Sequence, residues 1–211
     1  MGDEPMIKGT PELIAQRREE IVNACEGLYR TMSFKDITLK EIGAATSFSR
    51  PTIYNYFQTK EEIFLALFER EYDRWNGELE EILNGEALTR PQLADKLAKS
   101  LERREQLLKL LSMNNYDMEA NSRQELLTSF KRAYGRSMAL IRAILSRFCP
   151  DMGPEEVQGF IYVFFPYMFG IYPYARVTDK QRGAMKDANV AYTYQSIYEL
   201  AHACLARLLG E

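Results

Sequence analysis

The spacing of apolar residues along the chain predicts an all-α protein. Apolar residues recur at intervals of three and four in nearly every segment, and the sustained alternation that strands show is rare. The longest uninterrupted example covers residues 122–148 and ends before Pro150. Its stripe is Leu127, Phe130, Tyr134, Met138, Ile141, Leu145 and Phe148. We therefore expect one long helix here and an all-helical fold around it.

Four helices are predicted in the first 83 residues, each preceded by a residue typical of helix N-termini. Ser and Thr hydroxyls accept hydrogen bonds from the free amides of a first helical turn. At Thr38 and Thr59 a glutamate follows three residues later, which is the pattern of a capping box. The predicted helices cover residues 11–28 after Thr10, 39–45 after Thr38, 50–55 after Ser49, and 60–83 after Thr59.

The remaining residues carry further helical patterns, separated by polar or proline-containing segments. Thr89 with Gln92 is another capping box, and a polar break follows near residues 114–117. An unusually aromatic helix begins at Pro154, a position that proline favours. The predicted order is a helix over residues 90–111, the break at Asn114, Asn115 and Asp117, the helix over 122–148, the aromatic helix from 154, a connector over 177–187, and a last helix over 190–209.

Composition indicates a folded chain that stays in the cytoplasm. Of 211 residues, 46% are apolar and 27% are charged, which fits one large domain or two small ones. The longest apolar stretch, residues 157–175, contains two glycines and two prolines and is shorter than the roughly 20 residues of a membrane span. The start of the chain lacks the basic and apolar regions of a secretion signal. We expect no membrane contact.

Few residues of the chain suit metal binding or catalysis. The cysteines Cys25, Cys149 and Cys204 are odd in number and far apart, which fits neither disulfide pairs nor a zinc site. His202 is the single histidine, and most hydrolases and metalloenzymes need an imidazole beside a nucleophile or metal. We expect no catalytic residues, no metal and no cofactor, and we expect the protein not to be an enzyme.

Positive charge gathers in one short segment although the whole chain carries a net charge of −3. Residues 35–60 contain four basic side chains against two acidic ones. A nucleic-acid site must therefore be local. In this segment the two short predicted helices are separated by a tight turn at residues 46–48, which gives a helix-turn-helix over about residues 38–57 whose second helix enters the major groove of DNA.

The residues of this motif divide into a buried set and an outward set. Ile42, Ala45, Phe48, Ile53 and Phe57 have the spacing to pack against the first helix. The outward set supplies donors for phosphates and base edges, and consists of Thr38, Ser49, Arg50, Thr52, Tyr54, Asn55, Tyr56 and Lys60. Within it we assign base contacts to Arg50, Thr52 and Asn55, and backbone contacts to Tyr54, Tyr56 and Lys60.

Simpler roles exist for several of these residues. Thr38, Ser49 and Thr59 act as N-caps in any helical protein, so phosphate contact is an additional expectation. Arg17, Arg18 and Lys40 are expected on a solvated face.

Residues 38–57, which read TLKEIGAATSFSRPTIYNYF, are followed by Thr59-Lys60-Glu61-Glu62, and this block resembles the TetR family of bacterial transcriptional repressors. The resemblance covers roughly residues 12–68. It implies a DNA-binding domain over residues 1–58 and a ligand-binding and dimerisation domain over 59–211. Where the family commonly has Ala-Gly in the turn, this chain has Thr46-Ser47, and a non-glycine residue at positive φ costs roughly 1 kcal/mol. We therefore expect a slightly different turn.

The resemblance also implies that the last two long helices, over residues 154–172 and 190–209, pair with those of a second subunit. The aromatic helix is apolar on almost all of its faces, which favours burial against other helices or a second subunit on several sides. An apolar ligand site is predicted from Trp75, Met113, Tyr116, Phe130, Tyr134, Phe165 and Phe169, with Asn114, Asn115 or Arg123 as polar groups. Ordinary core packing is the alternative for each aromatic residue in this set.

The predicted function is that of a homodimeric repressor. It binds double-stranded DNA at an inverted repeat and is released by a hydrophobic or aromatic small molecule, whose identity the sequence leaves open. An activator, or a regulator that needs a corepressor, fits the same residues. A small-molecule carrier or an enzyme is the third alternative, and no catalytic set supports it.

Overall fold

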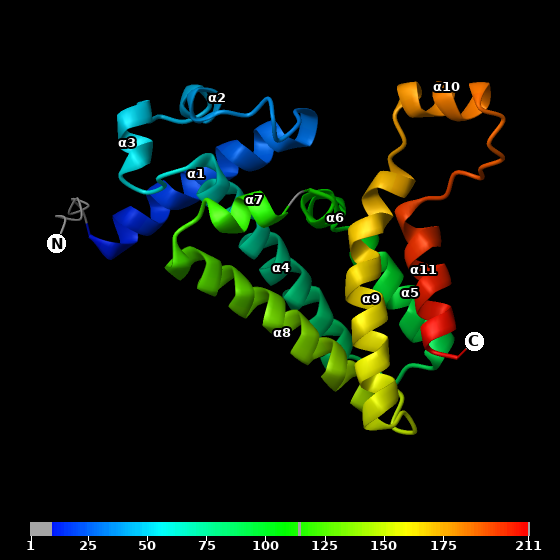
Figure 1. Cartoon of the computed structure of the whole chain (residues 1–211). Helices are drawn as coiled ribbons and strands as arrows, with labels where there is room; N and C mark the ends of the chain where they lie inside the picture. Colours follow the sequence, from blue (N-terminus) through cyan, green and yellow to red (C-terminus); the bar gives the residue numbers. More distant parts are fainter. Residues whose placement is uncertain (1–9, 114, 211) are drawn as a thin grey trace. The chain divides into compact units, whose positions relative to one another are not determined.

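The computed structural model describes residues 10–113 and 115–210, and the regular secondary structure in that part is entirely helical (Figure 1). The prediction of an all-α fold is confirmed. Contacts divide the chain into two compact units. The first unit takes Met1–Arg70 and Asn114–Arg132, and the second takes Glu71–Met113 and Ala133–Glu211. The sequence-based domain boundary between residues 58 and 59 stays a prediction.

The first unit is built on three N-terminal helices. These are α1 (Pro11–Thr31), α2 (Leu39–Ala44) and α3 (Arg50–Tyr54), and α2 contacts both α1 and α3. The first eleven residues of α4 (Lys60–Asn84), the short α7 (Asn115–Ala120) and the start of α8 (Gln124–Phe148) complete the unit. Its fully buried residues include Ile21, Cys25, Ile37, Ile42, Ile53, Phe57 and Phe64.

The turn between α2 and α3 has ordinary backbone angles. Within the described residues, Asn189 is the one non-glycine residue with positive φ, so Thr46 and Ser47 make the turn without the positive φ that costs a non-glycine residue roughly 1 kcal/mol. The Thr46 hydroxyl donates to the Gly43 carbonyl at 3.1 Å and accepts from the Phe48 amide at 3.3 Å. A polar side chain thus satisfies the backbone of the turn in place of a glycine conformation. Ala45, predicted to be buried, is exposed at this turn, and Phe48 is half-buried.

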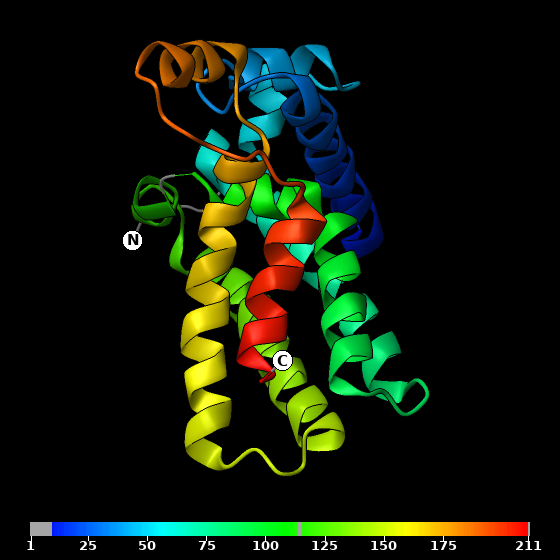
Figure 2. The ribbon, with the colours of Figure 1, turned by 90° about the vertical axis from the view of Figure 1, so that its right-hand side faces the viewer.

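The second unit is a layered bundle. It contains the later turns of α4 and α8 together with α5 (Arg90–Glu102), α6 (Glu105–Leu111), α9 (Pro154–Ala175), α10 (Asp179–Asp187) and α11 (Ile197–Leu208). Helix α11 packs against α5 and α9, and α6 packs against α9 (Figure 2).

Polar side chains tie three helices of this unit together in the interior. The Trp75 indole of α4 donates to the Ser100 hydroxyl of α5 at 3.0 Å. The Asn76 amide donates to the Ala133 carbonyl of α8 at 3.0 Å and accepts from the Ser137 hydroxyl at 2.7 Å. Buried polar groups without partners are costly, so these pairs fix the register of α4 against α5 and α8.

The single helix predicted over residues 90–111 is wrong, because α5 and α6 are separate. The chain breaks at Arg103 and Arg104, and both guanidinium groups bind Glu78 of α4. Both cations lie at the break between the two helices, and each binds one residue of α4. The predicted polar break near residue 115 is also wrong, because α7 is helical there; Asn114 lies outside the described residues.

The connector and the last helix also differ from the prediction. Residues 179–187, expected in a connector, form α10, whose N-cap Thr178 has a reciprocal capping box with Gln181. The last helix begins at Ile197, not near residue 190, because Ser196 and Glu199 form the capping box that starts it. The aromatic helix α9 begins at Pro154 as predicted and continues through Pro166.

Candidate nucleic-acid interface

Helix α3 presents a row of exposed polar side chains. Ser49, Arg50, Tyr54 and Asn55 are exposed, and Thr52 is half-buried. The Arg50 guanidinium donates to the Tyr54 hydroxyl at 3.1 Å and lies 5.7 Å from the centre of its ring. This contact joins positions i and i+4, which are neighbours on a helix surface. It holds a cation and a phenol together on the outer face of α3.

The chemistry of this face suits DNA. A guanidinium binds the O6 and N7 acceptors of guanine, and an asparagine amide binds adenine, in the major groove. Ser49 is the N-cap residue of α3 by its backbone, yet its hydroxyl contacts Thr52 at 2.9 Å and caps no amide. Pro51 has no amide hydrogen and the Thr52 amide donates to the Ser49 carbonyl at 2.9 Å, so the exposed Ser49 hydroxyl and the Arg50 guanidinium are the groups here that suit phosphate oxygens.

Thr38 has the cap role that the sequence predicts. Its hydroxyl accepts from the Lys40 amide at 3.2 Å at the start of α2 and also contacts the Glu41 carboxylate. The Glu41 pKa lies below the ordinary glutamate value, chiefly because of the hydrogen bond with Thr38. Both side chains lie at the solvent-facing start of α2.

Tyr56 does not face outward, and that part of its predicted assignment is wrong. Its side chain is only 2% exposed, and its hydroxyl accepts from the Arg17 guanidinium at 3.0 Å. Its carbonyl accepts from Arg18 and from Arg123, each at 3.2 Å. Tyr56 lies two residues after the last residue of α3, so these arginines hold the segment at the end of that helix.

Lys60 is half-buried and points toward the segment before α2. Its ammonium donates to the carbonyls of Phe34 and Ile37 at 2.9 and 3.2 Å and lies 4.1 Å from the centre of the Phe34 ring. The side chain thus joins the start of α4 to the segment between α1 and α2. A contact between the Lys60 ammonium and a DNA phosphate therefore has to use the same N–H groups that bind these two carbonyls.

Two charged residues of α1, Arg18 and Glu20, contact the helix-turn-helix in ways that the sequence analysis does not predict. Arg18, expected on a solvated face, lies 4.4 Å from the centre of the Phe57 ring, and burial lowers its pKa. Glu20 accepts from the Ser47 amide at 2.8 Å and the Ser47 hydroxyl at 2.7 Å, and these bonds lower its pKa. The sequence alone did not reveal these contacts, because a charged side chain that binds a group distant in sequence produces no periodic pattern of residues.

Glu62, a buried residue in the first turn of α4, forms an ion pair with Arg123, which lies just before α8. Glu62 of α4 is 1% exposed, and its carboxylate binds the Arg123 guanidinium at 2.8 and 3.0 Å. It also accepts from the amides of Gln58 at 2.7 Å and Arg123 at 3.1 Å. Burial opposes the charge of Glu62, but these hydrogen bonds outweigh it, so its pKa lies below the ordinary value. Arg123 was predicted as a polar group of a ligand site, and the structure places it in the first unit instead.

The predicted ligand residues only partly come together. Trp75, Tyr134 and Phe165 form an aromatic cluster in the second unit, with ring centres 6.1 Å apart for Trp75 and Phe165 and 5.6 Å apart for Tyr134 and Phe165. Tyr72 joins the cluster at 5.6 Å from Tyr134. Trp75 and Phe165 are buried and Tyr134 is half-buried, so the cluster is packed as core.

The other predicted ligand residues lie outside this cluster. Phe130 belongs to the first unit and packs on Phe68, with ring centres 4.8 Å apart. Tyr116 is 85% exposed, Phe169 is exposed on α9, and Met113 is half-buried. Of the predicted polar groups, Asn114 and the side chain of Asn115 lie outside the described residues.

A cavity of about 230 Å³ lies elsewhere in the second unit, between α4 and α5. Its lining is mostly charged and consists of Glu78, Glu81, Ile82, Lys96, Lys99 and Arg103. Among the described residues, no group of three or more His, Cys, Asp or Glu side chains is placed to hold a metal ion. None of the helices in this part of the chain has the length and apolar character that a membrane crossing needs.

Known protein families match both parts of the chain. The N-terminal family described as "Bacterial regulatory proteins, tetR family" matches residues 21–67, and "Tetracyclin repressor-like, C-terminal domain" matches residues 69–208. The chain belongs to the TetR family. Proteins of this family are DNA-binding transcription regulators with a ligand-binding C-terminal domain, so the helix-turn-helix of α2 and α3 is the DNA-binding element.

Solved structures of other TetR-type regulators share the fold. The fatty acid degradation regulator FadR from Bacillus halodurans is 17% identical, with 96% of this chain and 97% of that chain covered and a TM-score of 0.59. FadR from Bacillus subtilis, in complex with stearoyl-CoA, is 18% identical over 91% and 97%, with a TM-score of 0.58. FadR from Thermus thermophilus, in complex with lauroyl-CoA, is 22% identical over 92% and 93%, with a TM-score of 0.56. No curated protein is significantly similar in sequence.

The lowered pKa of Glu62 gives a prediction for stability. Glu62→Gln keeps the shape of the side chain and removes the charge that Arg123 binds, and we expect it to lower the free energy of unfolding at pH 7 by roughly 2 kcal/mol. A carboxylate with a lowered folded-state pKa stabilises the fold above its unfolded pKa of about 4.3, and this contribution is lost as pH falls through the folded pKa. The difference between wild type and variant therefore shrinks below about pH 5, as urea unfolding at each pH measures.

The matched control is Glu61→Gln, which removes the same charge from the preceding, less buried residue. We expect it to change stability by less than about 0.5 kcal/mol. A wild-type advantage over Glu62→Gln that stays constant down to pH 3 would contradict this role for the charge of Glu62.

Proposed function

We propose that this protein is a homodimeric repressor that binds an inverted-repeat operator and acts in the cytoplasm. The exposed Arg50–Tyr54 pair on α3, beside Asn55, carries the proposal, since it is a compact set of donors suited to base edges. Two copies of α3, one from each subunit, enter major grooves about one turn of DNA apart. Thr52 contacts bases together with Arg50 and Asn55, and Thr38 and Ser49 contact phosphates. Tyr56 and Lys60 support the motif from inside, and Lys60 adds positive charge.

The proposed subunit interface is an exposed stripe on α9. Tyr162 is 67% exposed and Val163 is 51% exposed, although both belong to the most apolar helix of the chain. Tyr167 and Tyr174 extend the stripe at helical spacing, and Gly159, Pro166 and Gly170 lie on the same face of the helix. Adjacent α11 adds the small residues Ala203 and Cys204, both half-buried. A self-complementary apolar face on paired helices is what a two-fold interface needs.

The proposed ligand is a molecule with a long apolar chain. Support comes from the aromatic cluster of Trp75, Tyr134 and Phe165, and from two structurally similar regulators that hold stearoyl-CoA and lauroyl-CoA. The cluster is closely packed, so an apolar chain has to enter by separating its rings. Such a ligand releases DNA only if it binds the conformation that does not fit the operator more tightly.

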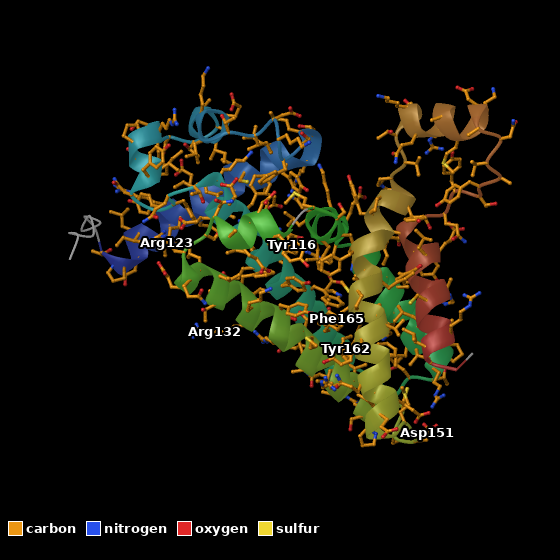
Figure 3. All side chains as sticks on the ribbon, in the orientation of Figure 1. Tyr116, Arg123, Arg132, Asp151, Tyr162 and Phe165 are labelled. Atoms are coloured by element: carbon orange, nitrogen blue, oxygen red, sulfur yellow. The ribbon has the colours of Figure 1, made fainter. Side chains whose placement is uncertain are left out.

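Arg50→Ala tests the DNA-reading role of α3. We expect the wild type to enrich an inverted repeat from a random pool of DNA duplexes at low salt, where phosphate contacts are strongest, and Arg50→Ala to enrich none. Arg132→Ala removes the same charge from an exposed position on α8 and should select the same repeat as the wild type (Figure 3). Failure of the wild type to enrich any sequence, or success of Arg50→Ala, counts against the proposal.

Stearoyl-CoA tests the ligand class. Trp75 is the single tryptophan and lies in the aromatic cluster, so its fluorescence reports any separation of the rings. We expect a saturable fluorescence change with stearoyl-CoA, accompanied by release of the selected duplex, and neither effect with free coenzyme A. An unchanged spectrum together with undiminished DNA binding would rule out a long-chain acyl thioester as effector.

Val163→Glu tests the interface. An unpaired charge in the middle of the α9 stripe is costly to bury, so we expect this variant to be a folded monomer where the wild type has twice the mass of one chain. Light scattering after gel filtration measures the mass, and circular dichroism checks the helical content. Ala139→Glu adds the same charge at an exposed position of α8 and should remain dimeric. A dimeric Val163→Glu protein would place the interface elsewhere.

A further inference from the structure

The Arg123 guanidinium contacts two different segments of the first unit. It binds both oxygens of the Glu62 carboxylate, at 2.8 and 3.0 Å, and also donates to the Tyr56 carbonyl at 3.2 Å. Glu62 lies in the first turn of α4, whereas Tyr56 lies just after α3. One planar cation thus joins the end of the recognition helix to the start of the next helix.

The turn that carries Arg123 makes a further contact with the same region. The Asn121 carbonyl accepts from the Thr59 hydroxyl at 2.9 Å, and the Arg123 amide donates to Glu62 at 3.1 Å. Residues 121–123 therefore hold the chain between α3 and α4 through a backbone carbonyl, a backbone amide and a guanidinium. These residues lie between α7 and α8, more than sixty positions along the sequence from the segment that they hold.

The end of α3 depends on contacts with other helices. Helix α3 has only five residues, and a helix that short depends on tertiary contacts for its stability. Arg18 of α1 also donates to the Tyr56 carbonyl, at 3.2 Å, so two cations converge on one oxygen. The buried Glu62 carboxylate offsets their mutual repulsion, and Glu69 and Glu125 are further acidic groups near the two arginines.

We infer that Arg123 is a positioning residue for DNA recognition. Together with Glu62 it fixes the segment over residues 55–59, and so sets the pose in which α3 presents Arg50 and Asn55. The inference rests on the proposed function, since it assumes that α3 reads bases. It assigns to the turn before α8 an indirect role in sequence selectivity, although that turn lies outside the helix-turn-helix.

A direct phosphate contact by Arg123 is the competing explanation, since its side chain is about one-third exposed. The two roles differ in how other variants behave. A phosphate contact is weakened little by Arg123→Lys, and its loss lowers the salt dependence of binding by about one counterion. A positioning role needs the bidentate geometry of guanidinium, so lysine does not restore it. Glu62 carries negative charge and cannot bind phosphate itself, so its loss weakens DNA binding only through position.

The experiment uses the full-length protein and the duplex that the wild type selects from a random pool. Arg123→Met, Arg123→Lys and Glu62→Gln are each compared with Arg132→Met, which removes a cation from an exposed position of α8. We expect the first three to weaken binding to the selected duplex by roughly tenfold or more, with nonspecific affinity and salt dependence unchanged. Arg123→Met combined with Glu62→Gln should be no weaker than either alone, since both remove one interaction.

Amide hydrogen exchange separates this inference from the proposed function. The Tyr56 and Phe57 amides donate to the Ile53 carbonyl at 2.9 and 3.0 Å, and the Gln58 amide donates to Glu62. We expect these amides to exchange at least about tenfold faster in Arg123→Met than in Arg132→Met, at a temperature where both are folded.

Three results would overturn the positioning role: unchanged exchange at these amides, full rescue by Arg123→Lys, or an equal loss of binding in Arg132→Met. Failure of the wild type to select any duplex would instead refute the proposed function. In that case the amide hydrogen-exchange measurement by itself tests whether Arg123 holds the end of α3.

Discussion

The burial of one face of α4 is the constraint on which the rest of the structure depends. Phe64 and Phe68 of this helix are buried in the first unit, and Tyr72, Trp75 and Leu79 are buried in the second. A single stripe at helical spacing therefore supplies both cores. Because aromatic side chains bury large areas, separating either core from α4 exposes a substantial part of its apolar surface. The helix that follows the DNA-reading motif is thus also a structural element of the regulatory part.

Around this helix, the arginines of the first unit act mainly as connectors. Tyr56 accepts hydrogen bonds from three of them, Arg17, Arg18 and Arg123. Arg70 of α4 binds Glu26 of α1 at 2.5 Å. Such cations are only partly exposed, so they form directed hydrogen bonds that surface charges seldom maintain. Arg50, by contrast, is exposed on α3, and its guanidinium contacts the Tyr54 hydroxyl of the same helix.

The second unit combines two kinds of apolar surface. Its interior is closed by aromatic rings that meet edge to face, as at Tyr134 and Phe165. Its α9 stripe, by contrast, leaves Tyr162 and Val163 exposed in a single chain. Exposed apolar patches often mark contacts with another molecule, which is why the proposed function assigns this stripe to a second subunit. The same helix therefore serves the core with one face and the proposed dimer with the other.

The sequence by itself determined the all-α fold, the helix-turn-helix, the outward positions Arg50, Tyr54 and Asn55, and the family. These features depend on local signals, because helical periodicity, N-caps and short motifs involve residues a few positions apart. Only the tertiary structure decided that Tyr56 is buried, that Arg103 and Arg104 both bind Glu78 where α5 ends, and that Phe130 belongs to the first unit. It also brought Arg123 to the end of α3. Each of these depends on a partner distant in sequence, and a side chain's type and local spacing do not specify which distant group it meets.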